Sequence, residues 1–239
     1  SATTGTTFAW TNNNTSIGLG ASGNGNVASF TATNTGTSAI TATITVTPTA
    51  NGCVGLPVNY TITVNPIPIV AAVLDETVCS NTATTAVTFT STTSGTTFSW
   101  TNNNTSIGLG ASGNGNVASF TATNTGASSI TATITVTPTA NGCVGLPISY
   151  TITVNPTPIV DPIPDETVCS NTAATPVIFT STTAGTSFTW TNNNTSIGLG
   201  ASGNGNIIFF PAINPGTLPI TGTITVTPTA NGCVGLPIS

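Results

Sequence analysis

The clearest pattern in the chain is a strict alternation of apolar and polar residues over residues 130–137. The positions on one side of this stretch are Ile130, Ala132, Ile134 and Val136, with threonine at every position between them. Successive side chains of a β-strand point to opposite faces of a sheet. The pattern therefore predicts a half-buried strand whose outer face is covered with threonine.

The same kind of pattern predicts further short strands around this one. The predicted strands are Ile69–Val73, Ala86–Thr90, Thr96–Thr101, Val117–Thr123, Ile130–Thr137 and Leu146–Val154, with Val78 and Cys79 just before or within the second. A long polar loop is expected over Asn102–Asn116, with a short strand around Ile107–Leu109 as an option inside it. About seven short strands separated by regular turns are typical of an immunoglobulin-like (Ig-like) antiparallel β-sandwich.

This pattern belongs to a unit that recurs along the chain. Trp10, Trp100 and Trp190 repeat every 90 residues without insertion or deletion, and we expect all three in a core, like the core tryptophan of Ig-like sandwiches. A unit of this length can bury its own core, unlike the shorter repeats of solenoids. The predicted fold class is therefore all-β, with tandem Ig-like antiparallel β-sandwich domains at a 90-residue period.

Proline-rich linkers set the expected divisions. Asn65-Pro66-Ile67-Pro68 recurs as Asn155-Pro156-Thr157-Pro158, and alternating prolines favour a short, extended and semi-rigid joint. The predicted divisions are residues 1–65, a partial repeat without its N-terminal part, residues 66–155, a complete repeat, and residues 156–239, a repeat without its last strand.

The five cysteines follow the repeat in two classes. Cys79 and Cys169 occupy one position of the unit, and Cys53, Cys143 and Cys233 occupy another, 64 residues further on. This spacing predicts disulfides Cys79–Cys143 and Cys169–Cys233, and it leaves the partner of Cys53 outside the chain. Each such loop would stabilise its unit by roughly 4 kcal/mol and indicates an oxidising, extracellular setting. A cysteine-only metal site is disfavoured, because each unit has two thiols and no histidine.

The charge inventory excludes several classes of function. The chain has no Lys, Arg or His and only five acidic residues. Binding of nucleic acid or of anionic lipid requires cations, and no run approaches the roughly 18 apolar residues of a membrane-spanning helix. A Ser or Thr nucleophile has no base, and the adjacent carboxylates diverge on extended backbone. We therefore predict no enzyme, no cofactor, no nucleic-acid partner and no membrane insertion in this segment.

The acidic residues gather near the linkers. They are Asp75, Glu76, Asp161, Asp165 and Glu166. Asp161, Asp165 and Glu166 are a candidate calcium site, because they could supply oxygen ligands at the second joint. The favoured interpretation is that the acids keep a nearly uncharged protein soluble and discourage pairing between strand edges. The first joint has Ala71 at the position equivalent to Asp161, so the three carboxylates do not recur there.

The polar loop is the candidate contact surface. Its amides could hydrogen-bond sugar hydroxyls or a neighbouring chain, and the residues concerned are Asn102, Asn103, Asn104, Asn114 and Asn116. The competing interpretation is a solvated loop that uses Asn and Gly for turns with positive φ. The loop is identical between copies, but this does not favour either interpretation, because residues 10–36 and 100–126 are identical throughout, strands included.

Three motifs carry a family resemblance over the whole chain. They are Glu-Thr-Val-Cys-Ser-Asn near the start of a unit, Phe-x-Trp-Thr in its middle and Pro-Thr-Ala-Asn-Gly-Cys-Val-Gly near its end. Together they resemble the PKD-like and Ig-like tandem repeats of giant secreted surface proteins of Bacteroidetes, including gliding-type adhesins. The resemblance implies stalk or fibre modules at the bacterial cell surface and supplies no catalytic residues.

The sequence thus predicts a structural stalk or fibre segment of a large extracellular adhesin or surface filament. The alternative is a binding module that recognises a surface glycan or a partner protein through its Asn/Gly-rich loops. Strand edges with so few charges could also permit self-association into fibres.

Overall fold

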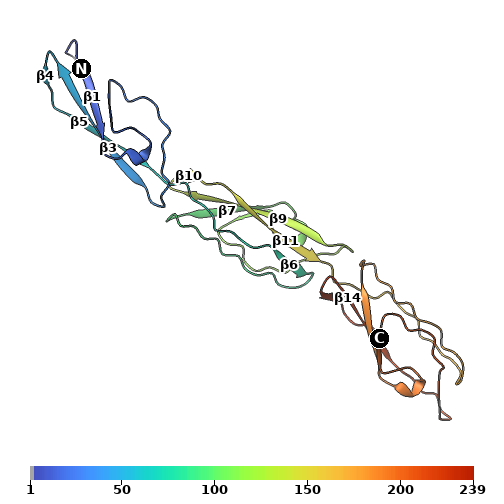
Figure 1. Ribbon diagram of the computed structural model, residues 1–239. Helices are drawn as coiled ribbons and strands as arrows, with labels where there is room; N and C mark the ends of the chain where they lie inside the picture. The colour runs from blue at the N-terminus through green and yellow to red at the C-terminus, as the bar shows by residue number, and fades with distance from the viewer. Residues whose placement is uncertain (1–2) are drawn as a thin grey trace.

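The computed structural model describes residues 3–239, which form a rod of three β-sheet units placed end to end (Figure 1). We call them units one, two and three. Their strands lie between Thr7 and Val64, between Glu76 and Asn155, and between Ser187 and Val234. The units follow one another along the rod in chain order, and in the described part of the chain no strand belongs to two sheets.

Each unit is built from the same set of short elements. Unit one has β1 (Thr7–Asn12), the 3-10 helix η1 (Thr15–Ile17), β2 (Ser22–Asn24), β3 (Ile40–Ala50), β4 (Cys53–Val54) and β5 (Val58–Val64). Unit two has β6 (Glu76–Cys79), β7 (Thr97–Asn102), η2 (Thr105–Ile107), β8 (Ser112–Asn114), β9 (Ile130–Ala140), β10 (Cys143–Val144) and β11 (Ile148–Asn155). Unit three has β12 (Ser187–Asn192), η3 (Thr195–Ile197), β13 (Ser202–Asn204), β14 (Ile224–Ala230) and β15 (Cys233–Val234).

The sheet of unit two has the strand order β6-β11-β9-β7-β8, with β10 also paired to β9. Its strands pair antiparallel except for β6, which runs parallel to β11 and places Cys79 opposite Asn155. A second layer of extended backbone covers the sheet and is joined by bridges between Ala83 and Thr121 and between Val87 and Val117. The apolar faces of both layers meet in one core, as a two-layer architecture requires.

The core is made by the alternation that the sequence displays. On β9 and β11 the buried side chains include Ala132, Ile134, Val136, Ile152 and Val154, all at most 1% exposed. The three tryptophans are each 8% exposed and belong to the core of their own unit. Trp100 lies against Gly113 of β8, and a Cβ at that position would overlap the indole ring. Glycine at residue 113 is therefore part of the tryptophan's packing.

The predicted class of tandem Ig-like β-sandwiches with a 90-residue period is confirmed. Four of the stretches predicted as strands are not strands. Ala86–Thr90 and Val117–Thr123 are extended backbone of the second layer, paired through the isolated bridges of Val87 with Val117 and of Ala83 with Thr121. Ile69–Val73 is extended but unpaired apart from one backbone hydrogen bond from Ala71 to Thr90. Ile107–Leu109 is also no strand: Asn104 caps η2, and Gly108 ends it with a φ of 96°. No helix among residues 3–239 has the length and apolar character needed to cross a membrane.

Candidate functional site

The described chain contains one disulfide, and it joins two units. The sulfur of Cys79 at the end of β6 is bonded to the sulfur of Cys233 in β15, and Cys53, Cys143 and Cys169 are free thiols. The predicted pairs Cys79–Cys143 and Cys169–Cys233 are therefore wrong. The bond that forms runs from unit two to unit three.

The topology of unit two explains why its own cysteines do not meet. Cys79 lies beside Asn155, where β11 ends, and Val154 of β11 lies opposite Ile130, where β9 begins. Cys143 lies beyond the other end of β9, opposite Ala140. The two cysteines are therefore separated by the length of β9, which at strand geometry is roughly 30 Å. Cys79 faces the next unit along the rod.

The cysteine of the partner unit is delivered by a tight hairpin. In unit three, Ala230 pairs with Cys233 across a two-residue turn of Asn231 and Gly232. Both turn residues have positive φ, 50° and 78°, as a type I′ hairpin turn requires and as the pair Asn-Gly favours. The same hairpin occurs at Asn141-Gly142 and at Asn51-Gly52. The motif Ala-Asn-Gly-Cys thus fixes the position of one cysteine class in every unit.

Non-covalent contacts align the joint between units two and three. The side-chain amide of Asn155 donates to the carbonyl oxygen of Asn231 at 3.0 Å. Gly235 packs on the carbonyl of Pro158 so closely that a Cβ would overlap the oxygen. Thr157 in the linker donates its hydroxyl proton to the carbonyl of Ser80 at 3.0 Å. The hairpin of unit three therefore lies against the linker that leaves unit two.

The joint between units one and two repeats these contacts without a disulfide. Asn65 donates its side-chain amide to the carbonyl of Asn141 at 3.0 Å, and Gly145 packs on the carbonyl of Pro68. Cys143 lies in the hairpin at this joint, half-buried and with a free thiol. The geometry of a joint is thus set by the asparagine, the glycine and the proline linker.

The asparagines of the polar loop are largely engaged within their own unit. Asn102 is 7% exposed, and its amide donates to the carbonyls of Leu109 and Gly110. The side-chain oxygens of the other residues accept backbone N–H groups, which come from Thr133 for Asn103, from Ser106 for Asn104 and from Phe89 for Asn116. Asn103, Asn114 and Asn116 are exposed, and Asn114 lies at the end of β8. Backbone N–H and C=O groups outside a sheet need other hydrogen-bond partners, and the asparagine side chains supply them here.

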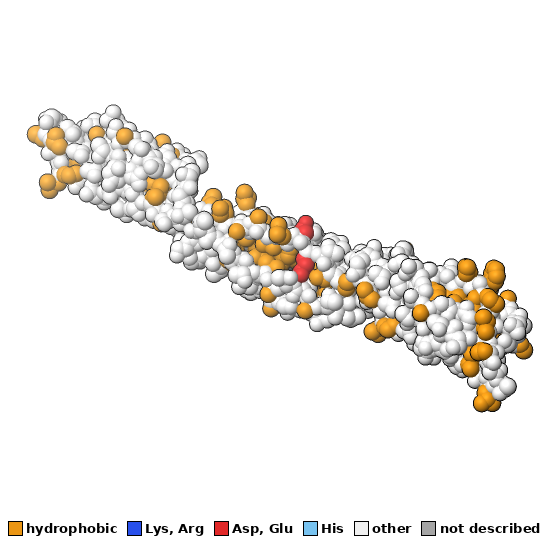
Figure 2. Space-filling view, turned by 60° about the horizontal axis from the view of Figure 1, so that its bottom comes forward, with side chains coloured by type: hydrophobic (Ala, Val, Ile, Leu, Met, Phe, Trp, Pro, Cys, Tyr) orange, Lys and Arg blue, Asp and Glu red, His pale blue; other side chains and the backbone are white. Residues whose placement is uncertain are grey.

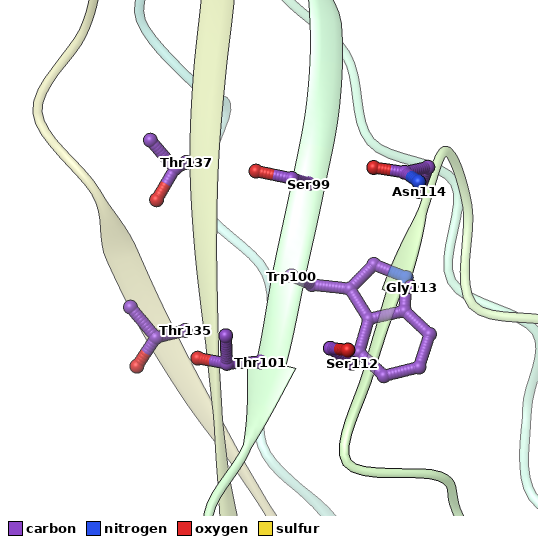
Figure 3. Close-up of a pocket in the computed structure, with 8 residues that line it drawn as sticks. All are labelled: Ser99, Trp100, Thr101, Ser112, Gly113, Asn114, Thr135 and Thr137. Carbon is purple, nitrogen blue, oxygen red and sulfur yellow. The ribbon is translucent and has the colours of Figure 1, made fainter.

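Beside Asn114 the outer face of the sheet forms a shallow hollow of about 250 Å³ (Figure 3). Six of the residues that line it carry a hydroxyl or amide group, and the other two are Trp100 and Gly113; the six are Ser99, Thr101, Ser112, Asn114, Thr135 and Thr137. Hydroxyl groups of this face also bond to one another, as between Thr135 and Ser149 at 3.0 Å. The hollow offers neutral donors and acceptors to a ligand and no charge.

The carboxylates of the candidate calcium site do not gather, and those of Asp161 and Glu166 accept hydrogen bonds from threonines. Glu166 accepts the N–H and the hydroxyl of Thr175, and these two bonds lower the pKa of its carboxyl. Asp161 accepts the hydroxyl of Thr180 at 2.6 Å, and Asp165 is exposed. Among residues 3–239, no three Cys, Asp or Glu side chains gather in a way that could hold a metal ion. The space-filling view accordingly shows two small red spots on an almost uncharged surface (Figure 2).

Comparisons with known proteins give one family match and several distant structural likenesses. The family of PKD-like domains matches residues 1–68 and 76–158. No curated protein sequence matches the chain. The solved structure of protocadherin gamma B2 extracellular cadherin domains 3-6 is 14% identical with a TM-score of 0.35, and it matches over 82% of this chain and 57% of its own.

Two further structures give a similar picture. Human CDH23 EC21-23 is 15% identical with a TM-score of 0.36, over 82% of this chain and 71% of its own. Mouse cadherin-23 EC22-24 is 12% identical with a TM-score of 0.33, over 95% of this chain and 83% of its own. The chain thus spans a little over half the length of the protocadherin structure, at 57%. These likenesses concern the fold alone.

Proposed function

The chain belongs to the family of PKD-like domains, and from this premise we propose that it is a segment of an extracellular structural stalk or fibre. In this role the units act as rigid spacers that hold other parts of a large surface protein away from the cell. The observation that carries the proposal is the disulfide from Cys79 to Cys233, because it joins two units rather than closing one. A covalent bond across a joint transmits tension between units, which an isolated binding domain does not need.

The repeated joint supports the same role. The contacts of Asn65 and Gly145 at the first joint recur as those of Asn155 and Gly235 at the second. Equivalent contacts at the two joints place successive units in one direction and give the rod its length (Figure 1). For this role we divide the chain into residues 1–65, 66–155 and 156–239, so that each boundary between divisions falls within an Asn-Pro linker.

The composition suits an exposed location. A disulfide persists in oxidising surroundings, which favours a position outside the cytoplasm. The absence of Lys and Arg leaves no cleavage site for trypsin-like proteases. The resemblance of the motifs to repeats of giant surface proteins supports the proposal that the stalk belongs to an adhesin of a Bacteroidetes cell, with gliding motility as its narrower form. The absence of His, Lys and Arg argues against catalysis, so no reaction is assigned to the chain.

Solution scattering of the full chain tests the stalk. A compact chain of 239 residues has a radius of gyration of about 18 Å. Three units in line, each with a central strand that spans roughly 30 Å, should give a maximum dimension of about 100 Å and a clearly larger radius. A radius near the compact value, or a dimension that varies with buffer as in a hinged chain, would contradict the stalk.

A second candidate function rests on the hollow beside Asn114. Its six hydroxyl and amide side chains could hydrogen-bond a neutral sugar, with the edge of Trp100 as an apolar contact (Figure 3). A glycan array probed with the full chain tests this candidate. Replacement of Asn114 and Thr137 by alanine should abolish any glycan signal, and retention of the signal would exclude the hollow as its origin.

A further inference from the structure

We propose that the outer edge of β5 is a binding site for an extended strand with the sequence of residues 75–80, carried by another copy of this repeat. We further propose that the cysteine of that strand forms a disulfide with Cys143. The ligand is thus a peptide segment of defined sequence, Asp-Glu-Thr-Val-Cys-Ser, and its attachment has a non-covalent and a covalent part. Four observations carry this assignment.

The first observation is that β5 has an open edge where its counterpart has none. The sequences of β5 and β11 differ only at their first two residues, and both strands pair with the long central strand of their unit. In unit two the other edge of β11 is covered by β6, whereas in the described part of the chain β5 pairs with β3 alone.

The second observation identifies the strand that fits. β6 adds to β11 in parallel, and Asp75 just before it accepts the backbone N–H of Thr151 at 2.6 Å. At its other end the N–H of Ser80 donates to the carbonyl of Asn155 at 2.8 Å. The equivalent groups of β5 are the N–H of Thr61 and the carbonyl of Asn65. An edge with the same backbone groups and nearly the same side chains selects the same strand.

The third observation is that one asparagine beside β5 already makes a bond that its counterpart makes in unit two. Asn124 donates its side-chain amide to Val154 at 2.8 Å while its backbone N–H donates to the hydroxyl of Ser80 at 2.9 Å. In unit one, Asn34 makes the first of these bonds, to Val64 at 2.8 Å. Its backbone N–H is the group that a serine following the strand's cysteine would meet.

The fourth observation concerns the thiol. At the second joint, Asn155 lies opposite Cys79 and donates to Asn231, and this arrangement brings Cys79 to Cys233. At the first joint Asn65 makes the same bond to Asn141. A cysteine opposite Asn65 would therefore lie as close to Cys143 as Cys79 lies to Cys233. Cys143 is the half-buried thiol at this joint, whereas Cys53 and Cys169 are exposed.

The covalent step is a thiol–disulfide exchange. The thiolate of Cys143 attacks the strand's sulfur when that sulfur is already in a mixed disulfide with a small thiol such as glutathione. The new bond joins Cys143 to the strand, the bond to glutathione breaks, and the leaving glutathione thiolate takes up a proton. Two free thiols would reach the same product with a disulfide as the oxidant. The step deepens the stalk function, because it would staple the first joint as Cys79–Cys233 staples the second.

The experiment uses the full chain and a synthetic peptide with the sequence of residues 75–82, whose cysteine carries glutathione. The modified cysteine is identified by mass spectrometry after chymotrypsin digestion, which the lack of Lys and Arg makes necessary. Binding at β5 should direct the peptide to Cys143 at least about tenfold faster than to Cys53 or Cys169, because a bound strand has a high effective concentration. Glutathione disulfide alone should show the opposite order and favour the two exposed thiols.

A matched pair of variants tests the strand edge. Thr151 directs its N–H to the segment before β6, and N–H groups alternate along a strand, so in β5 the N–H of Thr63 faces the open edge. Thr63→Pro removes this donor at an edge where proline is tolerated, and it should abolish the preference for Cys143. Thr63→Val loses the same hydroxyl but keeps the N–H, and it should preserve the preference.

A scrambled peptide with its cysteine at the same place gives a control that does not depend on the folding of a variant. It should react faster with the exposed thiols of Cys53 and Cys169 than with the half-buried thiol of Cys143. The inference is overturned if the peptide of residues 75–82 also follows exposure, or if Thr63→Pro keeps the preference for Cys143. Either result would leave the stalk untouched, because scattering of the chain alone tests that function.

Discussion

The two joints of the rod differ in one covalent bond and in little else. At both joints an asparagine at the end of one unit donates to the hairpin of the next, and a glycine packs on the carbonyl of a linker proline. Cys79–Cys233 spans the second joint only, whereas Cys143 at the first joint is free. The alignment of two units therefore does not need the disulfide. The joint is already aligned without the disulfide, and the disulfide makes the two units harder to separate.

Loss of the disulfide should have the largest effect on this comparison. Cys233→Ser opens a loop with a sequence separation of 154 residues, which should lower the free energy of unfolding by up to about 5 kcal/mol. When the oxidised chain is pulled from its ends, the residues between Cys79 and Cys233 should stay hidden. Reduction should then release an extra length on the order of 500 Å. Single-molecule extension measures this length.

The matched control is Cys143→Ser, which removes the free thiol from the equivalent position of the first joint. It should leave both the melting temperature and the released length unchanged. An oxidised chain that extends fully without reduction would show that no covalent bond spans the second joint.

A second test breaks the alignment and keeps the disulfide. Gly145→Ala and Gly235→Ala each place a methyl group on the carbonyl oxygen of a linker proline, and the overlap should cost about 1–3 kcal/mol of joint stability. Spin labels on either side should show that the first joint opens, while the second stays tethered through Cys79 and Cys233. Gly55→Ala is the control, because Gly55 is exposed and its nearest neighbour is a proline of its own hairpin. Equal opening at both joints would mean that the disulfide limits no motion.

The joints also show what the sequence could and could not predict. The alternation in Ile130–Thr137, the turn of Asn141-Gly142 and the 90-residue period are local or periodic signals, and each corresponds to an observed element. The spacing of the cysteines is a weaker signal. In a repeat, the distance in sequence from a cysteine to its possible partner is constant both for a partner in the same unit and for a partner in the next unit, so the spacing does not distinguish the two. From the 64-residue spacing we expected the partner within the unit, whereas Cys79 bonds to the partner in the next unit. The choice depends on β6 running parallel to β11, and no pattern within four residues reveals the direction of a strand.

The same limit applies to the polar loop. The sequence indicated both a contact surface and a loop that uses asparagine for its own turns. In the structure Asn102, Asn103 and Asn104 hold backbone groups of their own unit, and such bonds depend on which strand the loop crosses. The recurring tryptophan was easier to place, because Phe98, Trp100 and the alternating residues around them mark the inner face of β7.

A third test compares units one and two through their tyrosines. Burial, and to a smaller extent the carboxylate of Glu76, raises the pKa of Tyr150 from 10.0 to about 12. The folded state holds the phenolic proton more tightly than the unfolded state, so this contribution to stability is complete below about pH 10. It is lost as the pH rises through about 12. Thermal melting between these pH values should therefore show a steep loss of stability.

Tyr150→Phe should reduce this alkaline loss. It should cost little at neutral pH, because the hydroxyl is buried without a hydrogen-bond partner among the described residues. Tyr60→Phe is the matched control in unit one, where the side chain is 41% exposed, and it should leave the alkaline profile unchanged. An alkaline profile that moves with Tyr60 rather than with Tyr150 would contradict the assignment.

The smallest expected effect is that of chelation, and it addresses the one charged difference between the joints. Asp161 near the second joint has Ala71 as its counterpart near the first, so a calcium ion there would make the second joint special. Its carboxylate instead accepts the hydroxyl of Thr180, and Glu166 is held by Thr175. EDTA should therefore leave the melting temperature and the distance across each joint unchanged in spin-label measurements. A shift confined to the second joint, and absent from Asp161→Ala, would instead identify a calcium ion as part of what holds units two and three together.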